Sequence, residues 1–148
     1  MNVTREAVHA ALFTLGSAVG GFVTSSRVLQ HWNSLSAGQF PAFYQAYVGE
    51  SSKRVYNQPA IWTMDFRWYL YVQVELADTP TGPMTVLNPL LDELEKTLGA
   101  PPGYVGGAPQ TLNGLVSHAW IEGDVETDEG TLGNTAVAII PVKVLATS

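Results

Sequence analysis

Apolar and polar residues alternate strictly along one long segment, residues 62–76. A period of two residues is typical of a β-strand with one buried face. At ~3.3 Å per residue the segment would extend roughly 50 Å, whereas strands usually have about 5–6 residues. We therefore expect this strand to bend, to contain a bulge or to pack against another chain. Its even positions are all apolar: Trp62, Met64, Phe66, Trp68, Leu70, Val72, Val74 and Leu76.

The N-terminal segment shows the spacing of an amphipathic helix over Arg5–Leu15. Thr4 is placed to cap its first turn, and Gly16 is expected to end it. Its apolar stripe consists of Val8, Ala11, Leu12 and Leu15.

A second helix is predicted by leucines at helical spacing before Gly99, which we expect to end it. Asn88 and Pro89 resemble an N-cap followed by proline at the first helical position. Thr81-Gly82-Pro83 is expected to open this helix, and its regular part is expected to begin at Asn88-Pro89.

The remaining pattern predicts four further strands and two polar loops. These elements combine into one α+β domain over residues 1–148, a mostly antiparallel sheet with two packing helices in the order α-β-β-β-α-β-β. Pro141 should bend the last strand or mark it as a sheet edge. The strands are expected at 28–32, 40–48, 115–121 and 134–147, with a hairpin loop at 49–59 and an acidic loop at 122–133.

Composition excludes several kinds of chemistry. The 148 residues include no cysteine, so disulfides, thiolate metal sites and cysteine nucleophiles are excluded. The formal net charge is −6, which disfavours a surface that grips phosphates. No signal sequence or transmembrane span is expected. Five of the thirteen acids lie close together, at Glu122, Asp124, Glu126, Asp128 and Glu129.

No motif for catalysis is present. Ser17 lacks the glycine spacing of a nucleophile elbow, and the three histidines are isolated in sequence. Two acids that converge in space would escape this test, since their spacing in the chain is free. We expect a protein that is not an enzyme and that holds no metal and no cofactor.

The acidic loop begins like a calcium-binding loop, with Asp124, Glu126 and Asp128 at alternate positions. Such a loop needs glycine at its sixth position and glutamate at its twelfth. Glu129 and Thr135 occupy these positions, so calcium is not expected. The loop is either a solvated surface or a repulsive lining that stops DNA from binding to a conduit. In the second case Asp124, Glu126, Asp128 and Glu129 face a pore.

The odd-numbered face of the long strand combines tyrosine with charged and amide side chains. Arg67, Tyr69, Tyr71 and Gln73 form a mixed surface of the kind found in protein interfaces. We predict a subunit interface there. A sugar-stacking surface, or an element of the same chain packed across the sheet, are the alternatives.

Several segments together resemble the tail terminator (tail completion) proteins of tailed bacteriophages, in the lambda-like group. The resemblance covers nearly the whole chain, from the amphipathic N-terminal helix through the long aromatic strand to the last strand. The segments that carry it are Gln39–Phe43, Leu98–Gly99, Gln110–Val116, Trp120–Gly123, Asp128–Gly130 and Ala136–Val142.

This resemblance implies an α+β subunit of a homohexameric ring in the neck of a virion. Such a ring caps the tail tube, ends tube polymerisation and presents a surface to the head-completion (connector) proteins. DNA passes through its centre without specific binding, and no membrane is involved. The family has no catalytic residues to transfer. Two alternatives are another head–tail connector protein and a carbohydrate-binding module that uses Tyr69, Tyr71 or Trp120.

Overall fold

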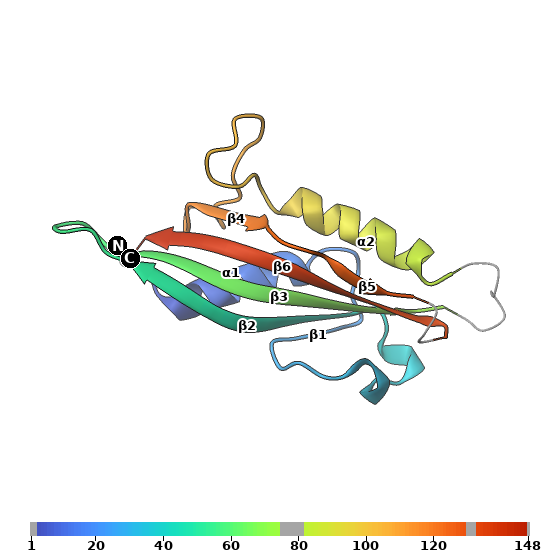
Figure 1. Cartoon of the computed structure of the whole chain (residues 1–148). Coiled ribbons are helices and arrows are strands. Elements are labelled where there is room, and N and C mark those ends of the chain that lie inside the picture. Colours follow the sequence, from blue (N-terminus) through green and yellow to red (C-terminus); the bar gives the residue numbers. More distant parts are fainter. Residues whose placement is uncertain (1–2, 75–81, 130–132, 148) are drawn as a thin grey trace.

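The computed structural model describes residues 3–74, 82–129 and 133–147. One sheet forms the body of the molecule, and two helices lie against it (Figure 1). Within the described residues, no helix is long and apolar enough to cross a membrane. The elements are α1 (Arg5–Ser17), β1 (Thr24–Ser26), η1 (Trp32–Ser34), η2 (Ala37–Gln39), β2 (Ala42–Lys53), β3 (Ile61–Gln73), α2 (Met84–Thr97), β4 (His118–Ile121), β5 (Glu126–Asp128) and β6 (Thr135–Thr147).

The sheet has the strand order β1-β2-β3-β6-β4, and β5 pairs with β6 on the same side as β4. Only the short β1–β2 pair is parallel. The expected α+β class with a mostly antiparallel sheet is therefore confirmed. β3 pairs along its whole length with β6, from Ile61 opposite Thr147 to Gln73 opposite Thr135.

The long strand needs no other chain to satisfy its backbone. β3 is flanked by β2 and β6 on its two sides. The described part of β3 pairs with β6 without a register shift, so it does not contain the expected bulge; the extra residue in its pairing with β2 belongs to β2, between Tyr47 and Gly49. The end of the alternating segment beyond Val74 falls outside the described residues.

The main core lies between the even-numbered face of β3 and the two helices. Val8 and Leu12 of α1 are fully buried, as is Leu94 of α2. The period-two pattern thus identified the buried face correctly. Its members are Trp62, Met64, Phe66, Trp68, Leu70 and Val72, all 9% exposed or less.

α1 begins as predicted, because the Thr4 side chain accepts a hydrogen bond from the Ala7 backbone N–H at 3.2 Å. Gly16 does not end the helix, which continues to Ser17. A Cβ at Gly16 would lie 2.5 Å from Phe43 Cζ. The glycine therefore permits close contact between helix and sheet instead of ending the helix.

α2 begins at Met84, directly after Pro83, so the expected opening is confirmed, whereas the start of the regular helix expected at Asn88-Pro89 is wrong. Pro89 lies inside the helix. The physical reason is burial: Leu87 is fully buried and belongs to the same apolar stripe as Leu90 and Leu94, so packing extends the helix upstream.

The second face of the sheet is covered at one end by residues 27–41. Trp32, Leu35 and Phe40 of this segment pack with Tyr44 and Tyr71 in a smaller cluster. The strand predicted at 28–32 is wrong, because β1 lies earlier and residues 32–34 form η1. An irregular segment of the same chain thus packs across this end of the sheet, which is one of the alternatives given for the odd-numbered face of β3.

β5 was not predicted, so the observed order contains one strand more than expected. It forms within the acidic loop and pairs with β6 from Glu126 opposite Ile139 to Asp128 opposite Val137. Pro141 of β6 lies between the residues that pair with β4 and those that pair with β5.

Pro141 does not mark an edge, since β6 lies between β3 and β4. Its carbonyl oxygen accepts the Glu122 N–H at 3.3 Å, on the side of β4. The N and C=O of one residue in a strand point to the same side. The missing N–H of Pro141 therefore falls in the gap between β4 and β5, and the ladder with β3 stays intact.

Candidate assembly surfaces

The predicted interface residues on β3 differ in exposure. Arg67 is exposed, Tyr69 and Gln73 are half-buried, and Tyr71 is only 4% exposed. Gln73 also donates a side-chain hydrogen bond to Thr135 at 3.3 Å. The subunit interface remains a prediction, and Arg67 is its most accessible member.

Tyr71 belongs to the packing of the chain itself. Its hydroxyl donates a 2.7 Å hydrogen bond to the carbonyl of Gln30, and its ring lies 5.6 Å from that of Tyr44. Burial raises the pKa of Tyr71 to about 12. The phenol therefore holds residues 27–41 on the sheet. At Tyr71 the odd-numbered face of β3 is thus covered by an element of the same chain, which was one of the alternatives to a subunit interface.

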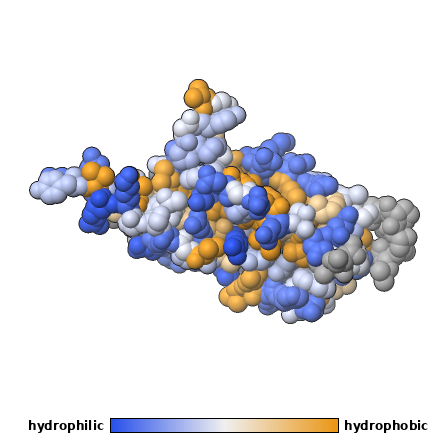
Figure 2. Space-filling model, in the orientation of Figure 1, coloured by the Kyte–Doolittle hydropathy of each residue, from blue (hydrophilic) through white to orange (hydrophobic). Residues whose placement is uncertain are grey.

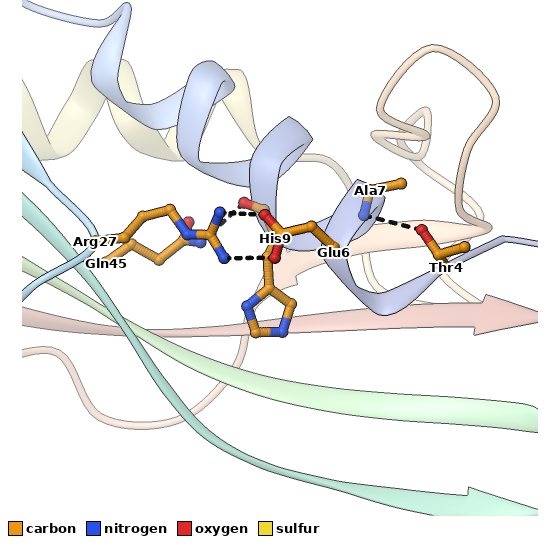
Figure 3. A network of polar contacts seen from close by, with 6 residues as sticks. All are labelled: Thr4, Glu6, Ala7, His9, Arg27 and Gln45. Carbon is orange, nitrogen blue, oxygen red and sulfur yellow. Dashed lines mark hydrogen bonds and ion pairs between the residues drawn. The ribbon is translucent and has the colours of Figure 1, made fainter.

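That covering segment is also tied to α1. Arg27 binds the Glu6 carboxylate through both terminal nitrogens, at 2.5 and 3.1 Å (Figure 3). Close by, the Gln45 amide donates to the carbonyl of His9 at 3.0 Å. The two hydrogen bonds between Arg27 and Glu6 fix the relative orientation of these side chains as well as their distance. The α1, β2 and covering segments therefore form one framework.

The four acids predicted to face a pore are all exposed. They are not equivalent, because Glu126 and Asp128 lie in β5 and Glu129 follows it. The Glu129 carboxylate accepts a 2.6 Å hydrogen bond from the Met84 N–H, at the start of α2. Glu129 therefore has a role within the chain, and the pore-facing position of the loop remains a prediction.

An apolar groove lies beside these acids, and sequence analysis did not find it. It has a volume of about 270 Å³ and is lined by Trp32, Val137 and Ile139 together with residues 126–128 of β5. Val137 and Ile139 alternate with the buried residues of β6, so a period-two pattern places them on the second face. What covers that face was not predictable, because Trp32 comes from a distant irregular segment.

Two loops project from the body of the molecule (Figure 1). The β2–β3 hairpin tip, residues 51–59, is exposed throughout and carries Lys53, Arg54 and Tyr56, the last 88% exposed. The loop at 101–109 is exposed throughout as well, and Val105 is fully exposed. Figure 2 shows apolar surface at the end of this second loop. Isolated exposed apolar side chains are common on protein surfaces, so Val105 alone does not define a contact site.

The aromatic row required by a carbohydrate-binding module is not formed by its predicted members. Trp120 is 5% exposed and Tyr71 is 4% exposed. Tyr69 is half-buried and packs against the second cluster. A flat sugar would therefore not reach these rings.

No protein-family model matches the chain, and no curated protein matches it. A solved chain from an assembly described as "Virion of native gene transfer agent (GTA) particle" is similar over 99% of this chain and 96% of its own length. The sequence identity is 12% and the TM-score is 0.45. At this level of similarity, no role is transferred from that particle to this chain.

Proposed function

We propose that this chain is a virion structural protein of a tailed phage that ends the tail tube. It would assemble as a homohexameric ring at the neck, between tube and head. The observation that supports this most directly is the sequence resemblance to tail terminator proteins, which is densest between Gln110 and Val142. That stretch includes β4, β5 and the first part of β6, so it contributes to the centre of the fold.

The ring would end tube growth through the surface that it presents. A closed ring is built from heterologous contacts, in which two different surfaces of each subunit meet. Exposed loops at separate places on the chain provide candidate contact surfaces. Once the ring covers the last tube layer, it presents different side chains, and further tube subunits find no matching surface.

The partners in this proposal are the chain itself, the tail tube protein and a head-completion or connector protein. DNA would cross the central hole without specific binding. The net charge of −6 supports this part, because a surface of like charge repels phosphates. The chain would act without catalysis and without a cofactor.

The nearest alternative is another connector protein of the neck. Gold-labelled chain added to purified tail tubes and to purified portal rings separates the two. A terminator labels one end of the tube, whereas a connector component labels the portal. Labelling of the portal alone would overturn the terminator assignment.

The carbohydrate-binding alternative makes a different prediction. Ligand stacking on a tryptophan changes its fluorescence, so a glycan panel should alter the emission of a carbohydrate-binding module. We expect no change, because Trp120 is buried. A saturable change with one glycan would favour the module instead.

A further inference from the structure

The groove and the β2–β3 hairpin tip lie at opposite ends of the sheet. The hairpin tip, residues 51–59, includes the end of β2 and lies just before Ile61, the first residue of β3. The groove lies beside Ile139, which is opposite Tyr69 of β3. Along β3, Ile61 and Tyr69 are eight residues apart, or about 26 Å at ~3.3 Å per residue. The tip projects away from the sheet (Figure 1), so it cannot enter the groove of its own chain.

The hairpin tip carries basic side chains that form no ion pair within the described residues. Of the seven basic residues, four lie within ion-pair distance of an acid, namely Arg5, Arg27, Lys96 and Lys143. Within the part of the chain that the structure describes, the other three, Lys53, Arg54 and Arg67, lie within ion-pair distance of no acid, and two of these three are on the tip. Beside them Val55 is 44% and Tyr56 is 88% exposed. Tyrosine and arginine are the side chains most often found at the energetic centre of interfaces.

The groove is complementary to this tip in apolar character and in charge. Its floor is apolar, with Trp32, Val137 and Ile139, and its rim carries the acids Glu126 and Asp128. Its volume of about 270 Å³ is below the ~300–1,000 Å³ typical of small-molecule pockets. A single large side chain is therefore a more suitable occupant than a ligand.

We propose that the hairpin tip of one copy of this chain docks into the groove of a second copy. Tyr56 contacts the apolar floor, and Lys53 and Arg54 lie beside Glu126 and Asp128. Because the tip and the groove are different surfaces, each copy can bind one neighbour on each side, as a closed ring requires. This deepens the proposed ring, on which it rests for the expectation of self-assembly. It places Glu126 and Asp128 between subunits instead of in a pore.

Cross-linking tests this contact directly, since the chain has no cysteine of its own. Two single variants, Val55→Cys on the tip and Ile139→Cys on the groove floor, are mixed under oxidising conditions. A matched control mixes Val55→Cys with Thr14→Cys, which lies on exposed surface of α1. All three positions are partly or fully exposed, so the fold should persist. We expect about tenfold more mixed dimer for the first pair, as a contact favoured by about 1.4 kcal/mol would give. Equal yields for the two pairs would overturn the proposal.

Charge reversal provides a second measurement. Arg54→Glu on the tip should lower the cross-linking yield, and Glu126→Arg on the groove should restore it in the same mixture. Added salt should lower the yield of the unaltered pair, because exposed charges are screened. A yield unaffected by Arg54→Glu would contradict the charge pairing.

The cross-linking result can be distinguished from the result that tests the proposed function. Normal tube capping without enriched cross-linking removes this contact and keeps the terminator. Enriched cross-linking in a chain that has no effect on tail tubes keeps the contact and removes the terminator.

Discussion

The carboxylate of Glu129 accepts a 2.6 Å hydrogen bond from the backbone N–H of Met84. Met84 is the first residue of α2, and the residue before it, Pro83, provides no side-chain cap. The first N–H groups of a helix lack partners within the helix, and negative charge is favourable there. An acid from the loop after β5 thus completes a helix start 45 positions earlier in the chain.

Removal of this contact should destabilise the fold. We expect Glu129→Ala to lower the free energy of unfolding by about 1 kcal/mol, the usual cost of losing a helix cap. Glu129→Gln keeps an acceptor oxygen and should cost less. Asp124→Ala is the matched control, since Asp124 is exposed and close in sequence. Urea denaturation of the variants measures the difference, and equal midpoints for Glu129→Ala and Asp124→Ala would contradict the role.

The hydrogen bond between Glu129 and Met84 must be kept when the predicted pore position of the acids is tested. Reversal of all four acids to lysine would place a positive charge at the start of α2. A cleaner variant reverses Asp124, Glu126 and Asp128 and leaves Glu129 unchanged. A pore position predicts slow DNA passage in normally assembled particles, whereas the subunit contact proposed for Glu126 and Asp128 predicts that the variant fails to form the ring. Unchanged DNA release from normal particles would contradict a pore position.

Gln45 joins two buried groups on opposite sides of its amide. Its oxygen accepts the Trp68 indole N–H at 3.0 Å, and its nitrogen donates to the His9 carbonyl at 3.0 Å. Gln45 is 3% exposed and Trp68 is fully buried. We expect Gln45→Leu to cost roughly 1–3 kcal/mol, because the buried indole N–H of Trp68 is left without a partner. Gln58→Leu, on the exposed hairpin, should have little effect. A Gln45→Leu variant as stable as Gln58→Leu in thermal unfolding would disprove this account.

Gly16 permits the close contact of α1 with the sheet. An added Cβ would lie 2.5 Å from Phe43 Cζ and 2.9 Å from Trp68 Cζ2, and both rings are fully buried. Alanine usually stabilises a helix by about 1 kcal/mol relative to glycine. Overpacking should outweigh this gain, so Gly16→Ala should be destabilised by about 1–3 kcal/mol.

The control for this substitution is Gly38→Ala, because no heavy atom lies within 4 Å of its added Cβ. We expect its melting temperature to stay close to that of the unaltered chain. A Gly16→Ala variant at least as stable as the Gly38→Ala variant would show that the contact between α1 and the sheet has room for a methyl group.

His9 should make stability depend on pH. Its ring centroid lies 4.4 Å from that of Tyr47 and 4.8 Å from that of Phe66. Burial, and then the charge of Arg27, lower the pKa of His9 below its ordinary value of 6.5. The unfolded chain therefore binds a proton at a higher pH than the folded chain does. Stability should fall as pH decreases through the ordinary pKa, and level off below the folded-state pKa.

The measurement compares the unaltered chain with His9→Gln between about pH 7.5 and about pH 5.5, where exposed carboxylates stay ionised. The difference in unfolding free energy between the two proteins should change with pH in favour of His9→Gln at the acidic end. A difference that stays constant over this window would exclude His9 as the cause.

Local patterns predicted the parts of the fold that depend on local chemistry. The alternation along β3 identified its buried face, and Thr4 identified the start of α1. The opening of α2 after Pro83 was predicted, but its regular part begins earlier than expected, because burial of Leu87 outweighs the cap signal at Asn88-Pro89.

The candidate contact surfaces were less predictable, because they depend on distant segments. Nothing in the sequence near Tyr71 indicates that residues 27–41 cover it. β5 is acidic and has little strand propensity, yet it pairs with β6. The groove exists only where Trp32, β5 and β6 meet. The hairpin loop was placed from its polar composition, but its projection and its exposed Tyr56 required the structure.

The length of tail tubes tests the central claim most directly. Tails assembled in cells with and without this chain are purified and measured in negative-stain images. A terminator predicts tubes of abnormal length, or tails that fail to join heads, when the chain is absent, and normal tails when it is restored. Tails of normal length joined to heads in its absence would contradict the claim.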